Sequence, residues 1–310
     1  MENIETLFKS KTLIVVAGPT AVGKTTLAIE LARHYGTDII SADSRQFYRE
    51  MSIGTAKPTP EELAQALHHF VNSHSITDSF NVGDFEQQGL QCLDRIFTDH
   101  DVAILAGGSG LYIKAICEGF DDVPAADPAI REGLNAAFAE HGLAYLQDKL
   151  KTADPTYYAE VDINNPQRII RALEVIAQTG QPFSSFRKAD VRQRPFRIIK
   201  IGLNLPREQL YNRINQRVDL MISEGLVAEV QSLLPYRGYN ALNTVGYTEI
   251  FDYLDGKTDL PSAIAAIKQN TRRFAKRQLT WFNKDKAFSW FEPSQLEAII
   301  NHIDKTASEA

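Results

Sequence analysis

The octapeptide "GPTAVGKT", residues 18–25, constrains the fold of this chain more than any other stretch. It matches the pattern GxxxxGK[ST], with an apolar run before it and an amphipathic helical pattern after it. In that context the glycines let backbone N–H groups turn toward an anion, and the start of the helix adds partial positive charge. The octapeptide therefore predicts a phosphate-binding loop. It leaves open whether the phosphate belongs to a nucleotide or to another diphosphate.

Two side chains of the loop carry specific chemistry. Lys24 supplies a mobile positive charge, and the Thr25 hydroxyl is placed to ligate a Mg²⁺ that bridges phosphate oxygens. We therefore expect Mg²⁺ as the cofactor. The residues predicted to bind the phosphates are Gly18, Pro19, Thr20, Ala21, Val22, Gly23, Lys24 and Thr25.

Four short apolar runs predict buried parallel strands, and helical patterns alternate with them. One helix is expected over 24–35, and another over 84–100 with Asp84 as its N-cap. Such alternation is typical of βαβ units, so the predicted fold is α/β: a P-loop NTPase-like, doubly wound parallel sheet. The four expected strands cover residues 12–17, 37–42, 101–108 and 196–205.

The strand–helix alternation stops between residues 120 and 195, where helix starts marked by proline recur at Pro128, Pro155 and Pro166. We predict a helical insertion domain over 121–195. The core is then formed by 1–120 and 196–310. Its second part is expected to be helical after the fourth strand and to end in a long helix over 262–282.

Composition is that of an ordinary globular enzyme, with 44% hydrophobic and 23% charged residues. No apolar run is long enough to cross a membrane, and the first residues lack the apolar segment of a signal peptide. The two cysteines form no CxxC pair, which favours a reducing cytoplasm. We expect a cytoplasmic protein, with no membrane association and no obligatory protein partner, acting as a monomer.

Charge is unevenly distributed along the chain. The formal net charge is −6, but acidic residues outnumber basic ones in 1–160, and basic residues outnumber acidic ones in 161–310. On the long final helix Lys268, Arg272 and Lys276 recur every four residues, and Arg273 and Arg277 widen this basic face. Such a face is typical of a phosphate-backbone contact, although a merely solvated surface has the same pattern. A core-facing stripe is expected opposite it at Ile264, Ile267, Phe274 and Trp281.

A carboxylate is expected next to the phosphate loop. The second predicted strand delivers Asp43 to the carboxyl edge of the sheet, where open α/β folds bind ligands. The third strand ends in glycines and Ser109 rather than in the aspartate that P-loop ATPases use for metal. Asp43 therefore suits removal of a proton from a nucleophile that attacks next to the diphosphate. Capping a turn, or holding the metal, are the alternatives.

Several separate stretches, in this order along the chain, resemble the tRNA dimethylallyltransferase family, also called tRNA isopentenyltransferases. They are "GPTAVGKT" (18–25), "DSRQFY" (43–48), "GTAKP" (54–58), "GGSGLY" (107–112), "NPQRIIRALE" (165–174), "RVDLMISEGLVAEV" (217–230), "VGYTE" (245–249) and "TRRFAKRQLTWF" (271–282). The resemblance implies that the loop holds the diphosphate of dimethylallyl diphosphate. The prenyl group then passes to N6 of adenine 37, beside the anticodon, in tRNAs that read codons beginning with U.

The resemblance also implies roles for particular residues. Asp43, assisted by Ser109, would accept or orient the proton of the adenine amine, and Arg217 would stabilise the departing diphosphate. A surface ion pair of Arg217 with Asp219 or Glu224 is the alternative. Family members usually carry a small residue where Val22 stands and Thr where Ser109 stands. Val22 would contribute mainly its backbone, and Ser109 keeps the hydroxyl.

The target adenine lies in a loop of stacked bases, so it must be extruded to reach the sheet edge. Residues expected to contact the tRNA follow Asp43, lie in the motifs that match the family or lie on the basic final helix; Arg131 of the insertion is a further candidate. They are Asp43, Ser44, Arg45, Gln46, Ser109, Arg131, Gln167, Arg168, Ile169, Ile170, Arg171, Asn243, Thr244, Val245, Gly246, Tyr247, Thr248, Arg273 and Arg277.

Two further groups of residues have open interpretations. Phe47, Tyr48 and Tyr112 could wall the prenyl tail, or could simply be core. The histidines of "LHHFVNSHSI" (67–76) lack a nearby carboxylate or cysteine that would complete a metal site, which favours a non-metal role. The family carries a histidine pair at the place of His68 and His69.

Three other functions remain as alternatives. An enzyme that prenylates free adenine nucleotides would not need the insertion or the basic helix. An ATP-dependent small-molecule kinase is disfavoured because the third strand lacks its terminal aspartate. An RNA-binding P-loop switch without transfer chemistry would not need Asp43.

Overall fold

The structure is a computed structural model that describes residues 10–121, 123–125, 127–187 and 191–309. The chain forms two compact units. The first, here called the core unit, comprises residues 1–117 and 193–310, and the second, the helical unit, comprises 118–192. The predicted insertion, drawn over 121–195 from sequence, falls on the helical unit with slightly different bounds.

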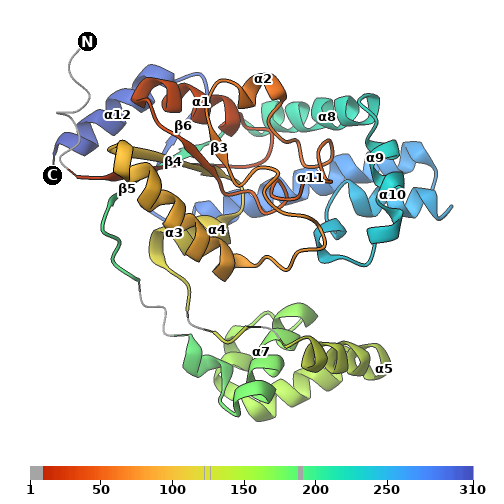
Figure 1. Ribbon diagram of the computed structural model, residues 1–310. Coiled ribbons are helices and arrows are strands. Elements are labelled where there is room, and N and C mark those ends of the chain that lie inside the picture. The colour runs from red at the N-terminus through yellow and green to blue at the C-terminus, as the bar shows by residue number, and fades with distance from the viewer. Residues whose placement is uncertain (1–9, 122, 126, 188–190, 310) are drawn as a thin grey trace. The chain divides into compact units, whose positions relative to one another are not determined.

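The core unit contains a six-stranded parallel sheet in the order β3-β2-β4-β1-β5-β6 (Figure 1). Its strands are β1 (Thr12–Ala17), β2 (Ile39–Ser41), β3 (His68–His69), β4 (Val102–Gly107), β5 (Arg197–Leu203) and β6 (Phe288–Phe291). The central strand β1 pairs with β4 on one side and β5 on the other, and every residue of it is buried. A parallel strand buried on both faces reads as an unbroken apolar run, which is why "TLIVVA" is visible in the sequence.

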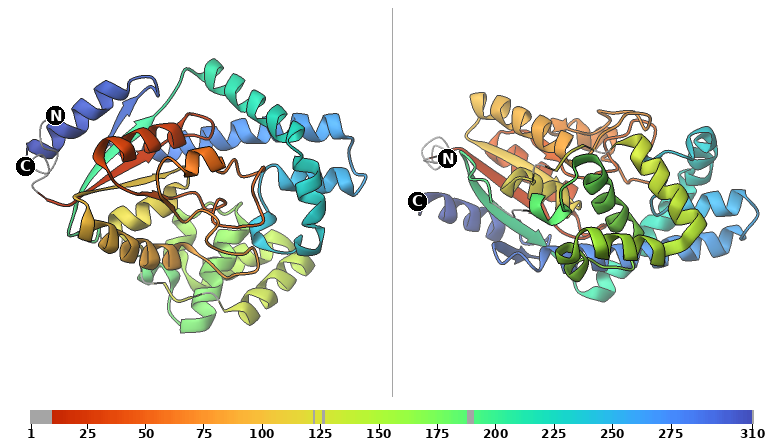
Figure 2. Two further views of the ribbon diagram at one scale, coloured as in Figure 1. Left: turned by 45° about the horizontal axis from the view of Figure 1, so that its top comes forward. Right: turned by 90° about the horizontal axis from the view of Figure 1, so that it is seen from below.

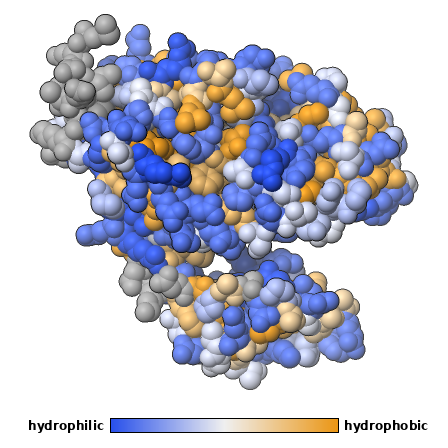
Figure 3. Space-filling view, viewed as in Figure 1, coloured by the Kyte–Doolittle hydropathy of each residue, from blue (hydrophilic) through white to orange (hydrophobic). Residues whose placement is uncertain are grey.

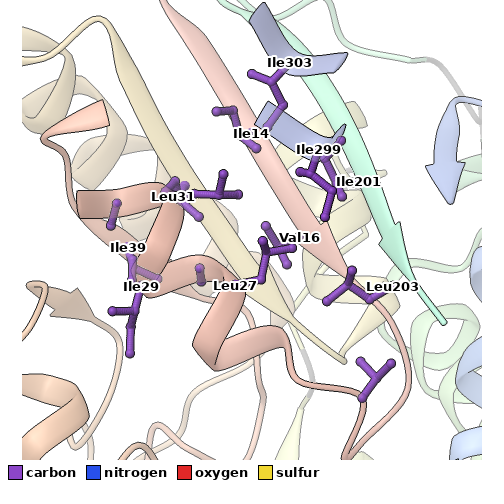
Figure 4. Close-up of a cluster of buried hydrophobic side chains, with 14 of the residues drawn as sticks. Ile14, Val16, Leu27, Ile29, Leu31, Ile39, Ile201, Leu203, Ile299 and Ile303 are labelled. Atoms are coloured by element: carbon purple, nitrogen blue, oxygen red, sulfur yellow. The ribbon is translucent and has the colours of Figure 1, made fainter. Parts of the chain in front are cut away.

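Helices cover both faces of this sheet, so the predicted doubly wound α/β fold is confirmed. On one face, α1 (Lys24–Tyr35) and α12 (Leu296–Ser308) pack on the sheet, and Figure 4 shows their Leu27, Leu31, Ile299 and Ile303 against β1 and β5. On the other face lie α3 (Val82–Asp99) and α4 (Gly110–Glu118). The left view of Figure 2 shows α3 and α4 across the strands from α1 and α12.

A third hydrophobic cluster joins the remaining helices of the core unit. They are α8 (Arg207–Ser223), α9 (Leu226–Ser232), α10 (Tyr247–Leu254) and α11 (Leu260–Phe282), with α2 (Pro60–Leu63) and short 3-10 turns at Leu234–Tyr236 and Asn240–Leu242. Tyr48 and Met51, from the segment after β2, join this cluster. The segment after β2 is therefore packed between the sheet and the C-terminal helices.

The helical unit consists of α5 (Pro128–Ala153), α6 (Pro155–Glu160), α7 (Pro166–Thr179) and a 3-10 turn, Phe183–Phe186. Each of the three α-helices has proline in its first turn and an Asp or Asn side chain as N-cap, as the sequence predicts. Leu146, Leu150 and Ile170 form part of its own buried cluster. α5 is kinked at Gly142, where φ is 76°.

Three sequence-based expectations about individual elements are wrong. The two edge strands β3 and β6 were not expected, because runs of two and four residues carry no readable periodicity. α3 begins at Val82 with Asn81 as its N-cap, and Asp84 instead completes a capping box from the third helical position. The helical stretch expected after β5 is confirmed and consists of two helices, α8 and α9, because Gly225 adopts a left-handed conformation between them. α11 is not the last element, since β6 and α12 follow it.

Within the described residues, no helix combines the length and apolarity that a bilayer span requires. In the space-filling view, hydrophilic residues are spread over the visible face and interrupted by smaller hydrophobic patches (Figure 3).

Candidate active site

The phosphate loop lies between β1 and α1 and is tightly curled. Gly18 has φ 155°, and a Cβ on it would meet the carbonyl oxygen of Leu203 at 2.5 Å, so only glycine fits there. Ala21 and Gly23 also have positive φ, 64° and 110°. This backbone shape is the one that turns successive N–H groups inward, so the structure has the cradle that the sequence predicts.

Lys24 folds back over this loop. Its Nζ donates to the carbonyl oxygen of Pro19 at 2.9 Å, and burial lowers its pKa to about 8. The negative charge of Asp43 opposes this lowering, and the positive charge of Arg217 adds to it. The three charged side chains thus act on one another, although they come from three separate parts of the sequence. An anion bound here would raise the pKa of Lys24 and keep it charged.

Asp43 follows β2 and faces the residues that follow β4. Its Oδ1 accepts from the backbone N–H of Arg45 at 3.1 Å, which is the turn-capping contact named as an alternative. The Ser109 Oγ accepts from the N–H of Ser44 at 3.0 Å and donates to the Ser44 Oγ at 3.2 Å. Ser109 therefore holds the segment that carries Asp43, and the second Asp43 oxygen stays available for a ligand.

Arg217 lies on α8 and is desolvated. Burial lowers its pKa, and the carboxylates of Glu62 and Asp43 oppose that effect. The surface pair with Asp219 is not formed, because Asp219 binds Lys268 at 2.6 Å. Among the residues described, no carboxylate lies within ion-pair distance of Arg217. A half-buried guanidinium without a carboxylate partner in the described part of the chain is suited to binding an anionic ligand.

One turn before Arg217, Arg213 also approaches the phosphate loop. Its Nη1 donates to the carbonyl oxygen of Val22 at 3.2 Å. The Val22 side chain itself is fully buried in the core, so its difference from the family pattern leaves the loop backbone intact.

A cavity of about 670 Å³ connects these groups within the core unit. Asp43, Ser109 and Arg217 line it together with Thr20 of the phosphate loop, so the structure brings the three predicted catalytic residues to one site. Its other lining residues are Ser44, Arg45, Gly54, Thr55, Ala56, Gly108, Gly110, Leu111, Tyr112, Ile214, Val218, Met221, Asn243, Thr244, Val245, Gly246, Thr248, Glu249, Ile267, Asn270, Thr271, Phe274, Arg277, Gln278 and Trp281.

Gln278 on α11 is a site residue that the sequence analysis missed. Its Nε2 donates to the Gly108 carbonyl at 2.9 Å, and its Oε1 accepts from the Thr20 N–H at 2.8 Å. The side chain is buried and joins the phosphate loop to the end of β4. A signal was present, because Gln278 lies three residues after buried Ala275 and so falls on the core-facing side of α11.

The two faces of α11 differ from expectation. Lys268 binds Asp219 and Arg272 donates to Asn215, so these two cations face α8 rather than forming an exposed stripe. Ile267 is buried as predicted. The predicted core positions Phe274 and Trp281 are 39% and 42% exposed and line the cavity. α11 packs through Ala263, Ala275 and Phe282 instead, because it is covered by α8 and α10 and not only by the sheet.

Arg273 and Arg277 are exposed on α11, and Arg277 reaches the cavity. The Arg277 guanidinium also lies over the Phe274 ring at 5.7 Å from its centroid. Of the predicted basic stripe, these two arginines and Lys276 remain accessible to a ligand in this unit.

Residues 43–45 and 243–246 line the cavity together with Thr248, whereas Gln46 and Tyr247 do not line it. Arg45 donates to the carbonyl oxygens of Asn240 and Asn243 at 3.3 and 3.4 Å. Gln46 donates to the Ala56 carbonyl at 3.2 Å. Tyr247 is different from its neighbours, because its side chain is fully buried and cannot touch a ligand.

In the helical unit the predicted RNA-contacting residues separate into two groups. Gln167 and Arg168 are exposed at the start of α7. Ile169 and Ile170 are buried in the hydrophobic cluster of the unit, so their side chains cannot line an RNA path. Arg131 and Arg171 both bind the buried Glu174, at 2.5 and 3.1 Å. These two arginines therefore stabilise the unit itself.

The histidine pair and two of the three aromatic residues are bound or packed within the protein. His69 Nε2 lies 2.9 Å from Asp38 Oδ2, and His68 Nδ1 lies 2.9 Å from the Ala66 carbonyl. Phe47 is fully buried and stacks on Phe85 at 5.5 Å, whereas Tyr112 lines the cavity. Tyr48 belongs to the third cluster, so of the three aromatics only Tyr112 can contact a ligand there.

The residues at the loop fit a Mg²⁺ that takes most of its ligands from bound phosphate and water rather than from the protein. In the described part of the chain, no group of three His, Cys, Asp or Glu side chains could hold a metal ion alone. Thr25 lies in the first turn of α1, and its hydroxyl makes no hydrogen bond with any described residue. A free hydroxyl beside a phosphate cradle matches the way Mg²⁺ binds through one protein oxygen, phosphate oxygens and water.

Comparison with known proteins gives the family. Residues 46–285 match the family model described as IPP transferase. The chain belongs to this IPP transferase family. It is 56% identical over 283 residues to the tRNA dimethylallyltransferase of Christiangramia forsetii, covering 91% of this chain and 94% of that relative. It is 51% identical to that of Cytophaga hutchinsonii, covering 97% and 99%.

Solved structures show the same fold. A tRNA isopentenylpyrophosphate transferase from Bacillus halodurans superimposes with a TM-score of 0.71 at 38% identity, covering 97% of this chain and 98% of that one. A eukaryotic dimethylallyltransferase acting on tRNA gives a TM-score of 0.73 at 26% identity, covering 88% and 70%.

Proposed function

We propose that this protein transfers the dimethylallyl group of dimethylallyl diphosphate to N6 of adenine 37 in tRNAs that read codons beginning with U, releasing diphosphate. The observation that supports it best is a single cavity lined by both Thr20 of the phosphate loop and the Asp43 carboxylate. The 46–56% identity to proteins named tRNA dimethylallyltransferase gives the substrate class.

The leaving group binds at the loop end of the cavity. Backbone N–H groups of the phosphate loop, the Lys24 ammonium and the desolvated Arg217 guanidinium stabilise the negative charge that develops as the C1–O bond breaks. Mg²⁺, held by the Thr25 hydroxyl, would neutralise further charge on the diphosphate oxygens. Tyr112 and Trp281 give this cavity apolar wall area next to C1.

The nucleophile enters from the Asp43 side. The adenine amine is weakly nucleophilic because its lone pair is delocalised into the ring, so a base must take its proton as N6 attacks C1. The Asp43 carboxylate is that base, and the Ser109 hydroxyl orients the segment that carries it. The N6–C1 bond forms, the C1–O bond breaks, the proton passes to Asp43 and diphosphate leaves.

Labelled dimethylallyl diphosphate tests the proposal. We expect label on N6 of one adenosine of a U-reading tRNA, dependent on Mg²⁺, and we expect Asp43→Asn to lower kcat by about 10²–10⁴-fold, the usual contribution of a general base. Label only on free AMP would identify the nucleotide-prenylating alternative, and ATP consumption without transfer would identify a kinase. If the protein bound tRNA but transferred no label, the alternative of an RNA-binding P-loop switch would be supported instead.

We further propose that the enzyme acts as a monomer in the cytoplasm. Size-exclusion chromatography with light scattering should then give the 34.7 kDa mass of one chain without RNA, and that mass plus the mass of one RNA when a tRNA fragment is bound. A mass of two chains that persists on dilution would contradict this.

A further inference from the structure

The carboxylate of Glu229 is saturated with hydrogen bonds although it lies outside the cavity. Glu229 belongs to α9, and its Oε2 accepts from the backbone N–H groups of Ser52 and Ile53 at 3.0 and 2.8 Å. Its Oε1 accepts from the N–H of Gly54 at 3.1 Å and from the Tyr247 hydroxyl at 2.6 Å. Four donors occupy the four acceptor positions of one carboxylate, and bonds to a charged acceptor are the strong ones.

The segment that Glu229 holds forms one wall of the cavity. Gly54, whose N–H group the carboxylate binds, lines it together with the next two residues, Thr55 and Ala56. Gly54 lies so close to the Tyr247 ring that a Cβ on it would be 2.5 Å from a ring carbon. The wall is therefore clamped between a buried aromatic ring and a carboxylate.

The wall in turn fixes Gln46. The carbonyl oxygens of Thr55 and Ala56 accept from the Gln46 Nε2 at 3.4 and 3.2 Å. The Gln46 Oε1 accepts from the Ser41 hydroxyl at 3.2 Å, in the strand that leads to Asp43. Both ends of the Gln46 amide are thus oriented by the protein, three residues from the proposed base.

We propose that Glu229 is a positioning residue for prenyl transfer: it fixes the 52–56 wall, and through the Thr55 and Ala56 carbonyls it fixes Gln46 and the turn that carries Asp43. This rests on the proposed function, since it takes the Asp43 side of the cavity as the place where the adenine enters. The phosphate loop makes no hydrogen bond with Glu229 among the residues described. Loss of Glu229 should therefore affect the two substrates differently.

Glu229→Gln tests this with Glu224→Gln as the matched control. In this variant an amide nitrogen, which cannot accept, faces two donors that an oxygen accepted from before. Glu224 is exposed at the end of α8, so the same change there removes a charge from the surface only. We expect Glu229→Gln to lower kcat/KM for tRNA about tenfold while KM for dimethylallyl diphosphate changes by less than about twofold, because only one substrate meets the displaced wall. If Glu229 only stabilised the fold, its loss would impair the use of both substrates to a similar extent. Equal losses for both substrates, or tRNA kinetics like those of the control, would overturn the proposal.

A double-mutant cycle with Gln46→Ala locates the effect. If Glu229 acts through Gln46, the double variant should be little worse than Gln46→Ala alone, giving a coupling of at least about threefold. Additive losses would contradict action through Gln46. The wild-type enzyme is assayed in parallel. If it transfers no prenyl group to tRNA, the proposed function is contradicted; if it does, the variants test the role of Glu229 alone.

Discussion

Replacing Gln278 by leucine should loosen the joint between the phosphate loop and the end of β4. The side chain keeps nearly the same volume, but the Gly108 carbonyl and the Thr20 N–H both lose their partner. The carbonyl bond is buried, so leaving that oxygen unpaired costs about 1–3 kcal/mol, and the partly buried N–H, which water can reach from the cavity, costs about 0.5–1 kcal/mol. We expect the free energy of unfolding to fall by about 1.5–4 kcal/mol.

The same change should weaken substrate binding, because Thr20 is part of the phosphate cradle. Urea unfolding followed by circular dichroism measures the stability, and isothermal titration with dimethylallyl diphosphate measures the binding. Gln269→Leu is the matched control, since Gln269 is exposed on the same helix and should change stability by less than about 0.5 kcal/mol. A Gln278→Leu variant as stable as this control, with unchanged diphosphate affinity, would refute the role assigned to the two hydrogen bonds.

Three further predictions concern charge. Burial lowers the pKa of Lys24 to about 8, so the affinity for diphosphate should fall as pH rises through about 8, where the ammonium loses its proton. Binding titrations from pH 6.5 to 9.5 measure this, and Lys24→Ala should abolish the pH dependence. Arg273→Ala with Arg277→Ala should weaken tRNA binding and reduce the slope of log affinity against log salt by about 2, and normal binding would contradict this placement of the RNA. Glu174→Gln should destabilise the helical unit by about 2–4 kcal/mol in thermal unfolding, less than a fully buried pair because Arg131 and Arg171 are partly exposed; an unchanged melting temperature would contradict it.

Most of the core fold could be read from local patterns. β1 and α1 occupy the residues expected, because a fully buried parallel strand is uniformly apolar and the helix that follows has a regular amphipathic pattern. The proline-marked starts of α5, α6 and α7 were equally readable, since proline and an Asp or Asn cap act within one turn of the chain. β3 and β6 could not be predicted, because they exist only by pairing with a neighbouring strand.

The candidate site was predictable where its chemistry is local. The phosphate loop is a continuous octapeptide, and Asp43 and Ser109 follow expected strands, so their convergence at the carboxyl edge follows from parallel pairing. The roles of Gln278 and Glu229 could not be predicted, for the opposite reason. Each lies about 170 or more residues from the backbone groups it binds, and even where the helical pattern places Gln278 on the core-facing side of α11, it does not say which groups the side chain will meet.

The sequence alone therefore determined the phosphate loop, the parallel sheet around it and the family to which the chain is similar, because periodicity, capping and loop chemistry act between near neighbours. Only the tertiary structure decided which polar residues serve the site. Lys268 and Arg272 turn toward α8 while Phe274 and Trp281 face the cavity, and this assignment of faces depends on which helices cover α11. A helix has a face toward every neighbour, and its own sequence does not say where those neighbours will be.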